Sequence, residues 1–192
     1  MARKYKEGSA VLFMDCQNDI VERLPGDKQK LFRKNASLIL EAARRAALPV
    51  FFMVARFREG YPELSPTNRL LSVVPEWRIL QEGTRGAELI PELAPRTGEP
   101  VVVKRRVSGF AGTELQTLLQ VKGVRRIVLL GTITSGCILS DARAALDMDF
   151  DLTIISDACA DFDDEVHRVL MEKVFPTQAT VLTTGDFLRL LR

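Results

Sequence analysis

Residues 127–146, IVLLGTITSGCILSDARAAL, combine a buried strand, a polar turn and a helix in one short stretch. The run IVLL is continuous and apolar, which is typical of a strand covered on both faces. The run CILSDARAAL has apolar residues at helical spacing. Gly131 ends the strand, and Cys137 stands where we expect the helix to begin. A cysteine at that position is either a small core residue or a nucleophile, and the function depends on which.

The same alternation of apolar strands and amphipathic helices continues along the chain. The longest predicted helix, residues 27–48, has Leu31, Ile39 and Ala43 among its apolar positions. Such alternation predicts an α/β fold, in which a parallel sheet lies between helical layers. We therefore expect one domain over residues 1–192, a Rossmann-like three-layer α/β/α sandwich with a six-stranded parallel sheet. The predicted strands are SAVLFMD (9–15), PVFFMVAR (49–56), EPVVVKRR (99–106), VRRIVLLG (124–131), DLTIISDAC (151–159) and QATVLTT (178–184).

The composition is that of an ordinary globular protein. Of 192 residues, 46% are hydrophobic and 27% are charged, and the net charge of +2 indicates no general affinity for nucleic acid or anionic membranes. No segment approaches the ~20 apolar residues of a membrane span, and no signal peptide follows the opening MARKYKEG. Three cysteines are too few for a disulfide framework, so we expect a reducing cytoplasm. The expected partners are a small-molecule substrate and further copies of the chain, in a homo-oligomer (dimer or tetramer).

Polar residues follow several predicted strands at the point where each strand ends. Asp15 ends the first strand, Lys104 ends the third, and Cys137 follows the fourth. Asp157 and Cys159 lie near the end of the fifth. The carboxyl ends of parallel strands meet at one edge of the sheet, where α/β proteins bind ligands. Topology alone therefore brings an acid, a lysine and a cysteine to one edge.

This trio has a coherent chemistry. A helix N-terminus and the positive charge of Lys104 would both lower the pKa of the Cys137 thiol. Asp15 could take the thiol proton and return it to a leaving amine, which is general acid–base catalysis. Backbone N–H groups of the GTITSG turn could hold the oxyanion of acyl transfer. The alternative is structural: the aspartate caps a turn, the lysine is a solvated edge residue, and the cysteine packs in the core.

Three segments resemble the isochorismatase-like cysteine hydrolases, and the similarity covers nearly the whole chain. VLFMDCQNDI (11–20) resembles that family's first strand, where an aspartate is followed by x-Gln-Asn-Asp. VVVKRRVSGFAGTEL (101–115) resembles its lysine segment, and residues 127–160 resemble its nucleophile segment. Each motif is moderately specific alone, but three in the right order are specific together. The turn TITSGC (132–137) most resembles the N-carbamoylsarcosine amidohydrolase branch.

The resemblance implies a role for each matched residue. Asp15 matches the general acid–base residue, Lys104 the lysine that stabilises the thiolate, and Cys137 the nucleophile. The family also has a non-proline cis peptide, which would fall between Thr132 and Ile133 and turn the N–H groups of Ile133 and Cys137 toward the oxyanion. The resemblance thus implies a hydrolase of a small amide, urea or N-carbamoyl compound that passes through a thioester and needs no cofactor.

Departures from the family's pattern narrow the substrate. Nicotinamidases carry an Asp-x-His metal site after the second strand, but residues 55–71 contain no histidine, so no metal site of that kind is expected. The chain's single histidine, His167, excludes a multi-histidine cluster. Isochorismatases proper lack the nucleophilic cysteine, so Cys137 favours amide chemistry. Ile20 stands where the family usually has phenylalanine, which would reshape the pocket.

Specificity is expected to come from the proline-rich segment 57–100, because such long excursions usually build a site or an interface. Arg56 could bind a substrate carboxylate through paired hydrogen bonds, and Phe110 and Thr132 are the other pocket candidates. The alternatives are a surface ion pair for Arg56, and for Phe110 packing at a helix start. For the remaining candidates we expect closure over the site or an interface for Tyr61, an interface or the core for Trp77, the core for Cys16 and Cys159, and a solvated or capping role for His167.

Two functions of different classes remain open. The first is a metal-independent cysteine amidohydrolase. The second is a non-catalytic relative that keeps the fold as a ligand-binding or interaction module. The complete set of Asp15, Lys104 and Cys137 favours the first. A flavin or dinucleotide protein is a weaker third hypothesis, because DCQNDI lacks the Gly-x-Gly-x-x-Gly turn that such proteins have after their first strand.

Overall fold

The computed structural model describes Tyr5 and residues 7–191, and it has the predicted α/β architecture. The strands are β1 (Ser9–Met14), β2 (Val50–Ala55), β3 (Val101–Lys104), β4 (Arg126–Thr132), β5 (Asp151–Ala160) and β6 (Thr180–Leu182). They form one sheet in the order β3-β2-β1-β4-β5-β6, and every neighbouring pair is parallel. The predicted six-stranded parallel sheet is therefore confirmed. The strand order reverses at β1 and β4, which lie side by side at its centre.

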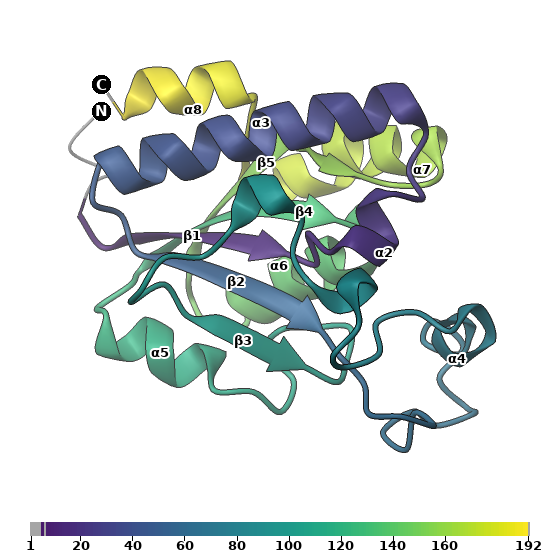
Figure 1. Cartoon of the computed structure of the whole chain (residues 1–192). Helices are drawn as coiled ribbons and strands as arrows, with labels where there is room; N and C mark the ends of the chain where they lie inside the picture. The colour runs from purple at the N-terminus through teal and green to yellow at the C-terminus, as the bar shows by residue number, and fades with distance from the viewer. Residues whose placement is uncertain (1–4, 6, 192) are drawn as a thin grey trace.

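Helices cover both faces of this sheet (Figure 1). One layer contains α3 (Gly26–Arg45), α7 (Asp164–Val169) and α8 (Thr184–Leu190), and the other contains α5 (Leu115–Val121) and α6 (Leu139–Leu146). The three-layer sandwich is thus confirmed. Within Tyr5 and residues 7–191, no helix combines the length and the apolar character that a membrane crossing needs. The short helical elements are α2 (Asn18–Val21), α4 (Val73–Trp77), η1 (Arg85–Ala87), η2 (Pro91–Leu93), η3 (Thr134–Ile138), η4 (Leu170–Val174) and η5 (Phe175–Thr177).

Burial on both faces explains why the central strands are uniformly apolar. Every residue of β1, β2 and β4 is buried, so none of these strands shows the alternation of a half-exposed sheet. Helix α3 buries Phe32, Ile39 and Ala43, whereas Leu31 is 52% exposed. Phe32 rather than Leu31 therefore takes the first core position, a distinction that apolar spacing alone did not make.

The irregular segment between β2 and β3 forms a second, smaller apolar cluster beside the carboxyl edge of the sheet. Most of its members come from this segment, and the others come from α2 and from the last residue of β2. Its buried members are Ile20, Ala55, Phe57, Val74, Ile79 and Leu80.

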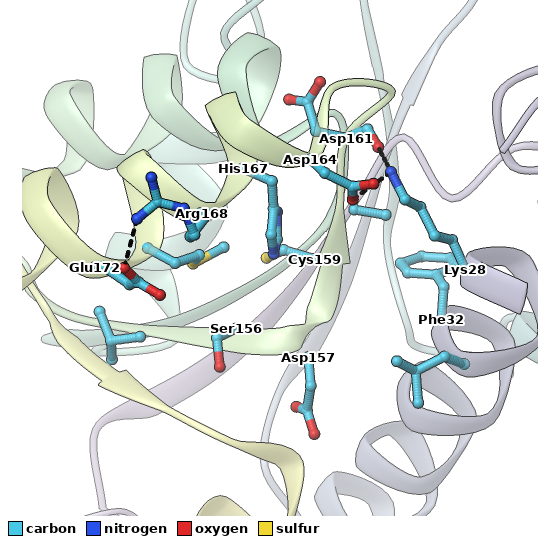
Figure 2. Close-up of a pocket in the computed structure, with 14 residues that line it drawn as sticks. Lys28, Phe32, Ser156, Asp157, Cys159, Asp161, Asp164, His167, Arg168 and Glu172 are labelled. Atoms are coloured by element: carbon cyan, nitrogen blue, oxygen red, sulfur yellow. Dashed lines mark hydrogen bonds and ion pairs between the residues drawn. The ribbon is translucent and has the colours of Figure 1, made fainter. Parts of the chain in front are cut away.

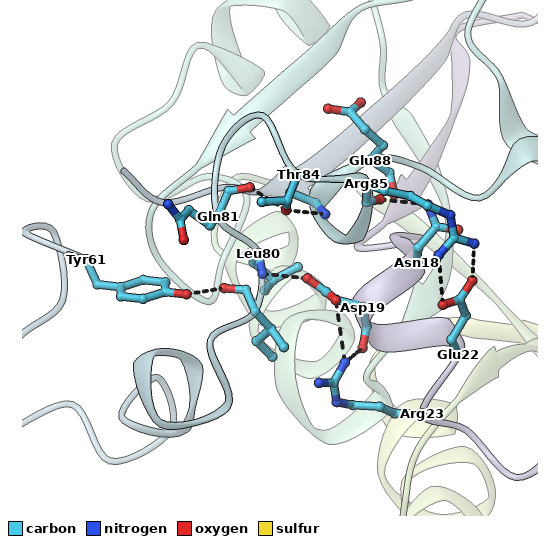
Figure 3. A network of polar contacts seen from close by, with 12 residues as sticks. Asn18, Asp19, Glu22, Arg23, Tyr61, Leu80, Gln81, Thr84, Arg85 and Glu88 are labelled. Atoms are coloured by element: carbon cyan, nitrogen blue, oxygen red, sulfur yellow. Dashed lines mark hydrogen bonds and ion pairs between the residues drawn. The ribbon is translucent and has the colours of Figure 1, made fainter. Parts of the chain in front are cut away.

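Polar side chains that follow β1 tie this segment to the body of the protein (Figure 3). Asp19 Oδ2 accepts the N–H of Leu80 at 2.7 Å. Asn18 Nδ2 donates to the carbonyl oxygens of Arg85 at 2.9 Å and Glu88 at 3.1 Å. The residues just after Asp15 therefore hold the segment between β2 and β3 against the carboxyl edge of the sheet.

Gly131 sets the close approach of β1 and β4 at this edge. It pairs with Met14, its φ is +138°, and a Cβ built there would lie 2.1 Å from the Met14 carbonyl oxygen. Both the backbone conformation and the lack of space therefore require glycine.

We expect Gly131→Ala to destabilise the fold by about 2–6 kcal/mol, because backbone strain and overpacking each cost about 1–3 kcal/mol. Gly26→Ala is the matched control. Nothing lies within 4 Å of a Cβ at Gly26, which starts α3, so this change should be neutral or stabilising by about 0.4–1 kcal/mol. Urea unfolding measures both, and equal effects of the two substitutions would contradict the prediction.

Candidate active site

Asp15, Lys104 and Cys137 meet at the carboxyl edge of the sheet, as the topology predicts. Lys104 Nζ lies 2.7 Å from Asp15 Oδ2, and the Cys137 thiol lies close enough to this pair for both charges to act on its pKa. The exposed fractions are 6% for Asp15, 2% for Lys104 and 3% for Cys137. Lys104 is therefore not a solvated edge residue, and the structural alternative for it is wrong.

The backbone of Asp15 is held from both neighbouring strands. Its N–H donates to the Met53 carbonyl on β2 at 2.9 Å, and its own carbonyl accepts the Thr132 hydroxyl on β4 at 2.7 Å. Gln17 adds a further tie, because its side chain donates to the Ala55 carbonyl at 2.7 Å and accepts the Ala55 N–H at 2.8 Å. These contacts stabilise the φ of +49° that turns Asp15 out of β1.

Cys137 does not begin its helix, contrary to the prediction. The π-helical turn η3 starts at Thr134 and runs without a break into α6, so Cys137 lies inside a helical turn. The polar residues of the GTITSG turn are themselves helical, which moves the helix start about one turn earlier. The Cys137 thiol donates to the Thr132 carbonyl at 2.8 Å, and the peptide bond between Thr132 and Ile133 is cis.

Burial controls the electrostatics of this cluster. Burial, followed by the negative charge of Asp15, raises the pKa of the Cys137 thiol well above its usual value, and Lys104 opposes this only in part. Burial also raises the pKa of Asp15. Burial would lower the pKa of Lys104, but the negative charges around it raise that pKa instead. The resting site therefore holds a neutral thiol beside an ion pair, and the expected lowering of the thiol pKa is not found.

Asp141 belongs to the same cluster, although it was not among the residues predicted for the site. It lies on α6, four residues after Cys137, and is 1% exposed. Its Oδ1 accepts the Ser108 hydroxyl and the Gly109 N–H, each at 2.7 Å. Burial raises the pKa of Asp141 to about 6, although Lys104 opposes the shift. The spacing from Cys137 was a usable signal, because residues four apart share one face of a helix.

The other predicted pocket residues have partners of their own. Arg56 forms a 2.7 Å ion pair with Glu88, which supports the surface ion pair considered for it. The Phe110 ring lies 6.3 Å from that of Phe150, which supports the packing alternative for Phe110. The Thr132 hydroxyl is occupied by the Asp15 carbonyl, as described above.

Residues of the second apolar cluster lie next to the turn that holds Cys137, residues 132–137. Ile133, directly after the cis bond, packs against this cluster, and Ile20 is one of its buried members. Tyr61 also packs there, and its hydroxyl donates to the Ile79 carbonyl at 3.1 Å. Trp77 is 47% exposed and lies under the Arg23 guanidinium, so the core position considered for it is wrong.

His167 contacts the turn that holds Cys137, although a solvated or capping role was expected for it. Its Nδ1 lies 2.8 Å from the Thr134 hydroxyl, and Asp161 Oδ2 accepts the N–H of Ser135 at 2.7 Å. Burial lowers the pKa of His167. His167 and Asp161 line a cavity of about 540 Å³ between α3, β5 and α7, together with the buried Cys159 (Figure 2). Neither Asp15, Lys104 nor Cys137 lines this cavity.

Among the side chains of Tyr5 and residues 7–191, no group of three or more from His, Cys, Asp or Glu is placed to hold a metal ion.

Comparisons with known proteins match this chain along nearly its whole length. Residues 9–186 match the model of the isochorismatase domain. The secreted isochorismatase effector Isc1 of Verticillium dahliae is 30% identical over 187 residues, which cover 94% of this chain and 90% of that protein. The ureidoacrylate amidohydrolase RutB of Rhizobium rhizogenes is 29% identical and covers 77% of this chain and 66% of its own length.

Solved structures agree with these sequence matches. A cysteine hydrolase from Pseudomonas syringae superposes with a TM-score of 0.87 at 24% identity, over 97% of this chain and 93% of that one. The N-carbamoylsarcosine amidase from Thermoplasma acidophilum superposes with a TM-score of 0.77 at 27% identity, over 92% of this chain and 96% of that one. The chain therefore belongs to the isochorismatase family of hydrolases.

Proposed function

We propose that the protein is a cysteine-dependent hydrolase of a small amide, urea or N-carbamoyl compound, with Asp15, Lys104 and Cys137 as its catalytic residues. The observation that carries the proposal is the buried ion pair of Lys104 and Asp15, whose charges both act on the buried Cys137 thiol at the same edge of the sheet. The names of two relatives, a ureidoacrylate amidohydrolase and an N-carbamoylsarcosine amidase, support this substrate class.

In the first half of the reaction, Asp15 accepts the proton of the Cys137 thiol as the sulfur attacks the substrate carbonyl. The resulting oxyanion is held by the N–H groups of Ile133 and Cys137. Asp15 then gives the proton to the leaving nitrogen, the C–N bond breaks, and a thioester remains. A thiol that is neutral at rest and lies within the influence of the Asp15 charge supports this order of events, because the base must act as the bond forms.

In the second half, water attacks the thioester and Asp15 takes the proton of that water. The acid leaves and the thiol regains its proton, so one water is consumed and one amine or ammonia is released. Lys104 keeps its charge throughout. Its ammonium donates to the Val107 carbonyl at 2.5 Å and faces Asp15, which supports a role in balancing the charge of the thiolate.

The walls of the pocket are part of the proposal. The apolar side chains around Ile133 and Ile20 support a substrate with an apolar part. Arg56 remains a candidate for binding a substrate carboxylate, in which case that carboxylate replaces Glu88, whose side chain is 55% exposed. All three cysteines are unpaired, which supports a reducing compartment. The homo-oligomer stays a prediction.

We expect Cys137→Ala to reduce ammonia release from the substrate by about 10³-fold or more, because the nucleophile is lost. Ammonia release from a panel of small amides, ureas and carbamoyl compounds is the measurement. Cys159→Ala, which removes another buried free thiol, is the control and should retain activity. Tight binding of panel compounds without any turnover would favour the non-catalytic module instead.

We expect Lys104→Met to slow turnover by about 10²–10³-fold, as the loss of an electrostatic partner commonly does. It should also destabilise the fold by about 3–5 kcal/mol, because Asp15 is left as an uncompensated buried charge. Lys122→Met makes the same change at an exposed lysine that caps α5. Turnover and urea unfolding of both variants give the comparison, and matching results for the two lysines would remove Lys104 from the site.

We expect turnover to survive removal of metal ions, because residues 1–166 contain no histidine and the Asp-x-His metal motif of nicotinamidases is missing. The protein is dialysed against EDTA and assayed for ammonia release with and without added zinc or manganese. Activity that disappears on dialysis and returns with either metal would overturn this expectation.

A further inference from the structure

Asp141 joins two segments that carry different catalytic residues. It lies on α6, which continues the turn that holds Cys137. Its Oδ1 receives hydrogen bonds from Ser108 and Gly109, which belong to the loop that follows Lys104. One carboxylate oxygen thereby connects the lysine loop to the nucleophile helix.

The loop is packed so closely that this connection fixes its position. A Cβ on Gly109 would lie 2.9 Å from the Met53 side chain, 3.3 Å from that of Met14 and 3.5 Å from Asp141 Oδ1. The Lys104 ammonium donates to the Val107 carbonyl in the same loop. A shift of the loop would therefore move a partner of the lysine.

The second oxygen of Asp141 indicates more than a structural tie. Oδ2 is fully buried, and it has no hydrogen-bond partner within the described part of the chain. The charged or titratable groups that act on this carboxyl are Lys104 from β3 and Asp15 from the end of β1, and Asp141 in turn acts on Cys137 from η3. The positive charge of Lys104 thus acts on two carboxyl groups, those of Asp15 and Asp141, as well as on the Cys137 thiol.

We propose that Asp141 is a positioning residue of this site, which holds the Lys104 loop on the nucleophile helix and whose own charge sets how readily the Cys137 thiol gives up its proton. This proposal rests on the proposed function, because it takes Cys137 as the nucleophile. When Asp141 is ionised, its charge draws on Lys104 and opposes a thiolate; when it is protonated, that opposition disappears.

The alkylation rate of Cys137 by iodoacetamide, followed by mass spectrometry between pH 5 and 9, tests this coupling. In the wild type, the ionisation of Asp141 near pH 6 should slow the rise of the rate with pH. Asp141→Asn keeps an oxygen acceptor for Ser108 and Gly109 but carries no charge. It should remove this inflection and raise the rate at pH 7 by about tenfold, the equivalent of one pKa unit.

Ser108→Ala is the matched control, because it removes one hydrogen bond to Asp141 and leaves the charge in place. Its profile should keep the inflection near pH 6. If Asp141 only stabilises the fold, both variants will give the wild-type profile, and the inference fails while the proposed function stands. If Cys137→Ala releases ammonia from the substrate panel as fast as the wild type does, the proposed function fails as well.

The charge of Asp141 has a second readout that does not depend on Cys137. Because burial raises its pKa to about 6, it remains protonated in the folded state above the pH at which it ionises in the unfolded state. Its contribution to stability is present below about pH 4 and is lost as the pH rises through 6. Between pH 4 and 7, the unfolding constant of the wild type relative to Asp141→Asn should rise about a hundredfold. A ratio of the two unfolding constants that does not change with pH would show that Asp141 does not titrate in this range, and would overturn the inference.

Discussion

The buried ion pair between Lys104 and Asp15 is the constraint on which this site depends. Its two residues come from β3 and from the end of β1, which are separated by β2 in the sheet. Removing two charges from water is costly, and apolar residues of similar volume often stabilise a core equally well. A pair that is buried this completely is therefore better explained by chemistry than by stability.

The charges around this pair explain why the Cys137 thiol is neutral at rest. One lysine faces two carboxylates, so its positive charge is already balanced before the thiol ionises. Ionising Cys137 would add a further negative charge to a buried site, which is why its pKa is raised. Moving the thiol proton to Asp15 leaves the total charge unchanged. The structure thus favours transfer of the thiol proton from Cys137 to Asp15 during the reaction over a thiolate that is already present before the substrate binds.

Pattern and topology predicted the sheet and the three central residues, because the carboxyl ends of parallel strands must meet at one edge. They did not predict the place of Asp141 in the site or the contact of His167 with Thr134, since each side chain comes from a helix and its direction depends on packing. They also placed the helix start at Cys137, because polar turn residues such as Thr134 and Ser135 do not look helical in isolation. Contacts between distant segments, such as that of His167 with Thr134, have no local signal.

Residues 17–19, which follow Asp15, bind the backbone of other segments with their side chains. Gln17 binds the backbone of Ala55, while Asn18 and Asp19 bind the backbone of the segment between β2 and β3. One short stretch therefore supplies Asp15, the acid–base residue of the proposed function, and also holds in place the segment between β2 and β3 that forms the wall of the site. Because the wall is an irregular segment carried by a rigid sheet, its apolar side chains can change without moving the ion pair. In the proposed function, substrate choice and catalysis can thus vary separately, although both depend on residues 15–19.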